Sequence, residues 1–168
     1  IEQPQDAPFV CGLLGYFGYD LGRQSQSIES SKPRATELPD LRVGLYLWSL
    51  VIDHELRKNT LYFHPRCPLD LQQKIRTLLT EKPKIADTGF ALKETFKPTV
   101  SKERYIEAIS QVKDYITEGD CYQVNYAQHL SAPFEGDLWQ AYKSLRNANP
   151  APYSAFWQWD NQAILSLS

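Results

Sequence analysis

The hydrophobic period of the chain changes at Gly119, and this change constrains the fold more than any other feature. Before it, residues 102–118 place apolar side chains at helical spacing, in a stripe made of Tyr105, Ile106, Ile109, Val112 and Ile116. After it, residues 119–128 read G-D-C-Y-Q-V-N-Y-A-Q and alternate with the period of a strand. Ser101 is placed to cap the helix, and Gly119 is placed to end it in a left-handed conformation. The sequence therefore predicts a helix followed directly by a strand with two different faces.

The predicted strand carries two side-chain amides, Gln123 and Asn125, on one face and the apolar residues Tyr122, Val124 and Tyr126 on the other. Residues two apart along a strand are separated by roughly 6.6 Å. An amide both donates and accepts hydrogen bonds without carrying a charge. The apolar face suits a core, and two interpretations of the polar face stay open from the pattern alone. The amides form either a structural polar ladder or one wall of a ligand-binding site.

Composition argues against several classes of protein. The 168 residues carry a net charge of -2 with mixed signs, whereas a nucleic-acid-binding face needs concentrated positive charge. The sequence contains neither an apolar run long enough to span a membrane nor a signal-peptide pattern, so we expect a cytoplasmic protein. Cys11, Cys67 and Cys121 are widely spaced and never form C-x-x-C. We expect reduced, mostly buried thiols, with neither a disulfide framework nor a zinc site.

The remaining patterns predict an α+β fold with mainly antiparallel sheets flanked by helices, because strands and helices follow no regular β-α-β alternation. Glycines at every third position of residues 9–22 indicate a strand with close backbone approach. Leu41 to Asp53 is the most apolar run and predicts one strand buried on both faces. Residues 23–39 predict a long surface loop after a turn or short helix at Tyr19-Asp20. Further elements are expected at residues 60–64 (strand), 68–80 (helix), 90–95 (short strand), 137–149 (helix), and 153–157 and 163–167 (a hairpin turning at Asp160-Asn161).

The chain is expected to have two domains and to be part of a longer protein. Residues 81–100 contain Pro83, Gly89 and Pro98, and we place a boundary there, with domains at 1–95 and 96–168. The chain lacks methionine and stops within a strand-like run, so we interpret it as an internal piece. A sheet edge and apolar surface without their cover would promote self-association, by strand exchange for example.

Three segments, in order, resemble the chorismate-utilising synthases. They are G-L-L-G-Y-F-G-Y-D-L-G-R at 12–23, the amide-bearing segment at 119–128, and N-P-A-P-Y-S-A-F at 149–156. Cys121, Asn125 and Ser154 resemble component I of the aminodeoxychorismate synthases, also called para-aminobenzoate synthases. Anthranilate synthase component I typically has F-Q-V-V and P-S-P-Y-M at these places and is the alternative. The resemblance implies a partial copy of the anthranilate synthase component I-like fold. Residues 1–95 would be the second part of its N-terminal, tryptophan-site region, and 96–168 the truncated start of its chorismate-binding region.

The resemblance also implies a reaction, in which chorismate and ammonia give 4-amino-4-deoxychorismate, a precursor of para-aminobenzoate and folate. Such a transferase uses Mg²⁺ and receives ammonia from a glutaminase subunit. Gln123 and Asn125 would bind substrate. Isochorismate-forming relatives have a lysine at the position of Gln123 that acts as general base on water. Ammonia already carries a free lone pair, so a neutral amide that orients it suffices.

The family's tryptophan-binding positions correspond to Pro152, Tyr153 and Ser154. Its catalytic lysine, its general acid and its metal-binding glutamates would lie beyond Ser168. The resemblance therefore implies no catalytic residue and no metal ligand within the chain, and the isolated chain is expected to be inactive. A different class stays open, namely a non-catalytic module that contributes tryptophan binding or contacts to the glutaminase subunit.

Overall fold

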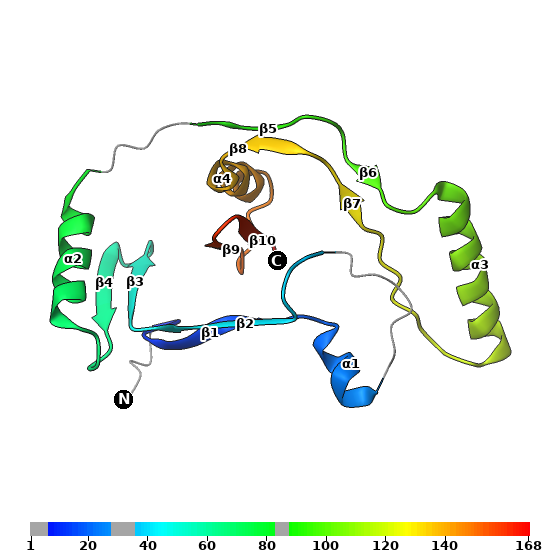
Figure 1. The fold of residues 1–168 in the computed structure, drawn as a ribbon, viewed down its shortest axis with the longest axis horizontal. Helices are drawn as coiled ribbons and strands as arrows, with labels where there is room; N and C mark the ends of the chain where they lie inside the picture. The colour runs from blue at the N-terminus through cyan, green and yellow to red at the C-terminus, as the bar shows by residue number, and fades with distance from the viewer. Residues whose placement is uncertain (1–6, 28–35, 83–87) are drawn as a thin grey trace. The chain divides into compact units, whose positions relative to one another are not determined.

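The computed structural model describes residues 7–27, 36–82 and 88–168, and the chain divides into two compact units, Ile1–Lys84 and Ile85–Ser168 (Figure 1). The first unit contains β1 (Gly12–Phe17), α1 (Leu21–Gln26), β2 (Leu41–Tyr46), β3 (Trp48–Asp53), β4 (Lys58–Phe63) and α2 (Leu69–Thr80). The second contains β5 (Phe90–Leu92), β6 (Lys97–Pro98), α3 (Lys102–Glu118), β7 (Leu130–Ser131), β8 (Phe134–Gly136), α4 (Leu138–Ala148), β9 (Ala155–Trp159) and β10 (Gln162–Ser166). All strand pairs of the described residues are antiparallel, which confirms the predicted α+β class. The functional division predicted at residue 95 stays a prediction.

The glycine-rich segment forms β1, which pairs with β2 from Gly12 opposite Tyr46 to Phe17 opposite Leu41. A Cβ at Gly15 would overlap the carbonyl oxygen of Arg42 and lie 2.7 Å from the Cα of Val43. The predicted close backbone approach is therefore confirmed at Gly15, where any side chain would push the two strands apart.

The apolar run from Leu41 to Asp53 is two strands, so the prediction of a single buried strand was wrong. The chain bends at Leu47, β2 pairs with β1, and β3 pairs with β4. The N–H of His64 donates to the carbonyl of Leu47 at 2.8 Å, which holds the bend at the end of the β3–β4 hairpin. Each sheet described has only two strands. Every second side chain of β2 is therefore exposed, although these exposed side chains are apolar enough to belong to a core.

The core of the first unit lies where α2 follows the β3–β4 hairpin. Cys67 and Ile75 are buried, and the guanidinium of Arg76 lies 5.1 Å from the ring centre of Phe63. The side-chain amide of Gln72 donates to the carbonyl of Cys67 at 2.9 Å. The predicted helix at 68–80 is thus confirmed with Pro68 as its N-cap residue. The three cysteines are free thiols, and Cys67 is buried whereas Cys11 and Cys121 are half-buried.

The predicted turn at Tyr19-Asp20 leads into α1. The expected loop at 23–39 therefore begins as helix, and its residues 28–35 lie outside the described part of the chain.

The second unit is built on a long two-stranded ribbon with a helix at its end. The β5–β8 pair is followed by the β6–β7 pair, and α3 lies beyond the last paired residues (Figure 1). The N–H of Lys93 donates to the carbonyl of Pro133 at 2.9 Å and joins the two pairs, and the N–H of Thr99 donates to the carbonyl of His129 at 3.0 Å. The short strand expected at 90–95 is confirmed for Phe90–Leu92.

The core of the second unit is an aromatic cluster between α4 and the β9–β10 hairpin. Tyr142 packs against Trp139 and Phe156, whose ring centres lie 5.4 and 5.5 Å from its own. Trp159, the last residue of β9, is also buried. The hairpin turns at residues 160–161, where Asp160 has φ +45°, as its residue pair predicted. The Asp137 carboxylate caps α4 by accepting from the N–H of Trp139 at 2.9 Å. None of the helices in the described ranges is long and apolar enough to cross a membrane.

Candidate functional site

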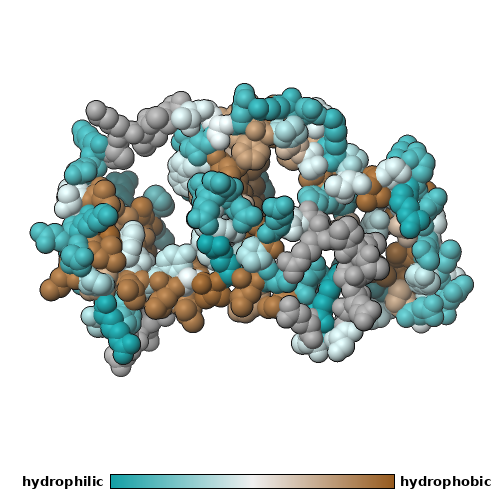
Figure 2. Space-filling view, in the orientation of Figure 1, coloured by the Kyte–Doolittle hydropathy of each residue, from teal (hydrophilic) through white to brown (hydrophobic). Residues whose placement is uncertain are grey.

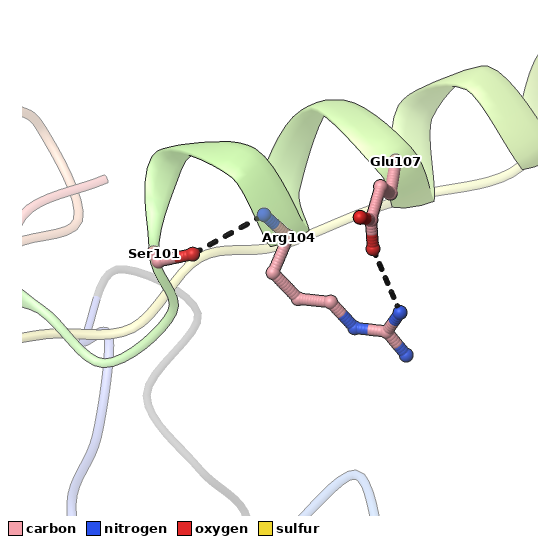
Figure 3. Close-up of polar contacts among 3 residues, drawn as sticks. All are labelled: Ser101, Arg104 and Glu107. Carbon is pink, nitrogen blue, oxygen red and sulfur yellow. Dashed lines mark hydrogen bonds and ion pairs between the residues drawn. The ribbon is translucent and has the colours of Figure 1, made fainter.

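The helix α3 lies directly before the predicted site, and hydrogen bonds fix both of its ends. At its start the Ser101 hydroxyl oxygen accepts a hydrogen bond from the backbone N–H of Arg104 at 3.2 Å, and the Arg104 side chain pairs with Glu107 at 3.0 Å (Figure 3). At its end Gly119 has φ +85°, its N–H bonds the carbonyl of Ile116, and the N–H of Asp120 bonds that of Tyr115. These two backbone hydrogen bonds form a Schellman motif, which ends a helix where a glycine can adopt the left-handed conformation.

Residues 121–128 form no strand, so the strand predicted there was wrong. Among the residues described, no segment pairs with them, and the next ladder begins at β7. A strand exists only where a neighbour takes up its N–H and C=O groups. The face predicted to be core is exposed as well, with Tyr122 at 92%. Tyr126 is the best anchored of this face, since its ring lies 5.4 Å from that of Tyr105 on α3.

The two predicted substrate-binding amides nevertheless lie together. The Nε2 of Gln123 donates to the Oδ1 of Asn125 at 3.3 Å, and both side chains are exposed. An amide has an acceptor oxygen with two lone pairs and a donor nitrogen with two N–H groups. Besides the second N–H of Gln123 Nε2 and the second lone pair of Asn125 Oδ1, this contact leaves the Oε1 of Gln123 to accept and the Nδ2 of Asn125 to donate. The pair can therefore both donate to and accept from a ligand, and whether it serves as a polar ladder or a ligand wall stays a prediction.

The predicted tryptophan-binding residues lie in the turn before β9. Pro152 and Tyr153 are exposed, and the backbone N–H of Tyr153 donates to the carbonyl of Ser168 at 2.8 Å. The Ser154 hydroxyl donates to the carbonyl of Ala151 at 3.0 Å. Since its proton is committed, the oxygen of Ser154 can only accept, which suits the ammonium group of an amino acid better than its carboxylate. The assignment of these three residues to tryptophan stays a prediction.

The second unit also holds an apolar pocket of about 330 Å³ that the sequence did not indicate. It lies between the β5–β8 pair, α4 and β10. Its lining residues are Phe90, Leu92, Phe96, Ala132, Phe134, Leu138, Ala141, Ser144, Leu145 and Leu165. Because no charged side chain lines it, the pocket does not suit a carboxylate ligand.

Metal and thiol chemistry find little support in the described ranges. Within residues 7–27, 36–82 and 88–168, no three His, Cys, Asp or Glu side chains gather in a way that could hold a metal ion. The Nδ1 of His64 accepts from the backbone N–H of Arg66 at 3.0 Å, which is a structural role. Desolvation by burial, together with the nearby Cys67, raises the pKa of the Cys11 thiol. Cys11 is therefore a weaker nucleophile than an ordinary thiol at neutral pH.

The chain is similar to one protein family over its whole length. The sequence profile of a family described as chorismate binding enzyme matches residues 1–168. Aminodeoxychorismate synthase component 1 of Klebsiella aerogenes is 41% identical over 99% of this chain and 36% of its own length. The protein of the same name from Escherichia coli K12 is 40% identical over 98% of this chain and 35% of its own length. Anthranilate synthase component 1 of Thermus thermophilus is 30% identical over 99% of this chain and 37% of its own length. The chain thus spans a little over a third of the length of these relatives.

The fold has a counterpart among solved structures. Anthranilate synthase component I from Streptococcus pneumoniae TIGR4 superposes with a TM-score of 0.84 and 23% sequence identity. The match covers 99% of this chain and 40% of the other. The expectation of a partial copy of that fold is therefore confirmed.

Proposed function

The chain belongs to the chorismate binding enzyme family, and on that premise we propose that it forms part of a component I that aminates chorismate with ammonia. The product is 4-amino-4-deoxychorismate, a precursor of para-aminobenzoate and folate, and the ring hydroxyl leaves as water. The observation that carries this choice is the difference in identity between two groups of relatives. Two relatives named aminodeoxychorismate synthase share 40 and 41% of aligned residues, whereas a relative named anthranilate synthase shares 30% over the same length of chain.

The amide pair supplies chemistry that suits this reaction. The Oε1 of Gln123 accepts an N–H of ammonia and leaves the nitrogen lone pair directed at the substrate ring. The Nδ2 of Asn125 donates to an oxygen of chorismate. A lysine in place of Gln123 would repel the ammonium ion that is in equilibrium with ammonia, and it would supply a base for water. A neutral amide therefore favours the amine as nucleophile. The contact between the two side chains supports this proposal because it holds the two amides next to each other with the Oε1 of Gln123 and the Nδ2 of Asn125 outside the contact.

Partners and cofactor follow from the same proposal. A glutaminase subunit supplies the ammonia, tryptophan binds at Pro152, Tyr153 and Ser154, and the protein acts in the cytoplasm. The magnesium ion implied by the family has no set of ligands among the residues described, so no step of the chemistry above depends on it.

The decisive test compares two glutamines of the same segment in the complete protein. Gln123 and Gln128 are both exposed, and Gln123 contacts Asn125 whereas Gln128 lies three residues further along the segment. Gln123→Lys should lower ammonia-dependent formation of 4-amino-4-deoxychorismate and raise the share of product formed with water. Gln128→Lys should leave both unchanged. Equal effects of the two substitutions, or anthranilate as the main product of the unsubstituted protein, would refute the proposal.

A non-catalytic role is the second candidate, and two observations favour it for the chain in isolation. The chain spans a little over a third of its relatives, and its amide pair is open to solvent. We expect no turnover from the isolated chain. Calorimetric titration with tryptophan should show binding that Tyr153→Ala weakens and Tyr19→Ala, at a fully exposed tyrosine of the other unit, does not. Turnover by the isolated chain would contradict this candidate.

A further inference from the structure

The segment that bears the amide pair is stretched between the two ends of α3. The helix has 17 residues, so at about 1.5 Å per residue it is about 25 Å long. It begins soon after Thr99, and the backbone N–H of Thr99 donates to the carbonyl of His129 at 3.0 Å. The chain therefore returns from Asp120, at the end of the helix, to His129, near its start (Figure 1).

This return leaves the segment little slack. Nine residue steps separate Asp120 from His129, and a fully extended chain covers at most about 32 Å in nine steps. A flexible linker of that length would span about 15–18 Å on average. A return of about 25 Å therefore takes up about four-fifths of full extension. The length of α3 holds residues 121–128 nearly straight, although no described segment pairs with them.

Between its two ends the segment is also fixed against the helix. The ring of Tyr126 lies 5.4 Å from that of Tyr105 with 63° between the ring planes, a favourable edge-to-face arrangement. Tyr105 is half-buried and lies at the start of α3, where the Ser101 hydroxyl caps the helix. Tyr126 directly follows Asn125, whose Oδ1 accepts from the Nε2 of Gln123. The ring contact therefore fixes the backbone beside the amide pair.

We propose that Tyr105 is a positioning residue, which holds Tyr126 against α3 and so sets where Gln123 and Asn125 are presented to the substrate. This proposal rests on the function proposed above, in which the two amides bind ammonia and chorismate. A displacement of about 1 Å in a group that orients a reactant can cost about 100-fold in rate. No residue of α3 is fully buried, and the surface over α3 in Figure 2 is mostly hydrophilic, so Tyr105 does not belong to the hydrophobic core. Its loss should therefore impair orientation and leave the fold in place.

The test uses the complete protein and compares two tyrosines of α3. Tyr105→Ala should lower the rate of ammonia-dependent amination about 10- to 100-fold and leave the rate of the reaction with water unchanged, so the share of product formed with water rises. Tyr115→Ala should change neither rate, since the Tyr115 hydroxyl accepts from Gln111 of the same helix at 2.7 Å. Tyr105→Phe keeps the ring and should restore amination. A merely structural loss lowers both reactions by the same factor, so an unchanged product ratio in Tyr105→Ala would overturn the proposal.

A double-mutant cycle tests whether Tyr105 acts through Tyr126. Tyr126→Ala should lower amination as Tyr105→Ala does, and the double variant should be no slower than either single variant. Additive losses would overturn the proposal. An unchanged product ratio in Tyr126→Ala would overturn it as well, and this variant decides the matter if Tyr105→Ala does not fold.

Gln123→Lys in the same assay separates this proposal from the one on which it rests. If Gln123→Lys shifts the product ratio and Tyr105→Ala does not, the positioning role alone is wrong. If Gln123→Lys has no effect, the proposed function fails and the positioning role fails with it.

Discussion

Replacing Tyr142 by alanine should strongly destabilise the second unit. Tyr142 is 5% exposed and contacts the rings of Trp139 and Phe156. Its burial corresponds to about 200 Å², or about 5 kcal/mol at about 25 cal/mol per Å². Residual burial in the unfolded chain lowers this by about 10–40%. The two aromatic contacts add about 0.5–1.5 kcal/mol each. These terms sum to about 4–7.5 kcal/mol, and since such substitutions cost about 3–5 kcal/mol we expect a loss of about 4–5 kcal/mol.

Tyr153→Ala is the matched control, because it removes the same side chain from the same unit at a position that is 81% exposed. It should cost less than about 1 kcal/mol. Urea unfolding followed by tryptophan fluorescence measures both changes, since three of the four tryptophans, Trp139, Trp157 and Trp159, lie in the second unit. Tyr142→Phe keeps the ring and should recover most of the loss. If the two alanine variants lost the same stability, the aromatic cluster would not be the core of this unit.

Three further predictions concern local features. Ser101→Ala removes the acceptor for the N–H of Arg104 and should cost about 1 kcal/mol, measured as faster hydrogen exchange in the first turn of α3. Because burial raises the pKa of Cys11, the folded state binds its proton more tightly than the unfolded state. The stability that this thiol contributes should be present below its unfolded pKa and be lost as the pH rises through the raised value, and Cys11→Ser should remove that dependence in unfolding titrations. Asp160→Val should destabilise the β9–β10 hairpin by about 1–2 kcal/mol because Asp160 has φ +45°, whereas Asp160→Gly should not; thermal unfolding distinguishes them.

Helices were predictable from the sequence because their determinants are local. The limits of α3 follow from a hydroxyl at Ser101, a stripe of apolar residues and a glycine at 119, and the structure has the helix at Lys102–Glu118. The turn at Asp160-Asn161 was predictable for the same reason, since the conformation depends on the two turn residues themselves.

Strands were harder because each depends on a partner that may lie far away in the sequence. Residues 119–128 alternate as a strand should, but no described segment offers them a ladder. Neither glycine nor proline marks the bend at Leu47 in the sequence. The apolar run that pairs with β1 before the bend and with β4 after it therefore looked like one strand. The amides of Gln123 and Asn125 contact each other although their segment is not a strand. Whether they line a substrate site depends on what lies opposite them, which the sequence pattern does not address.

The ribbon of the second unit has a consequence for how its chain tolerates change. The hydrogen bond from Thr99 to His129 closes residues 100–128 into a loop that contains α3 and both amides. The entropy of closing a loop grows only with the logarithm of its length, so doubling the loop would cost about 0.6 kcal/mol. Insertions at residues 120–121 would therefore be tolerated far better than insertions into α4, whose packing holds the core. We therefore expect that the residues of the segment that bears the amide pair can be replaced with little effect on the fold.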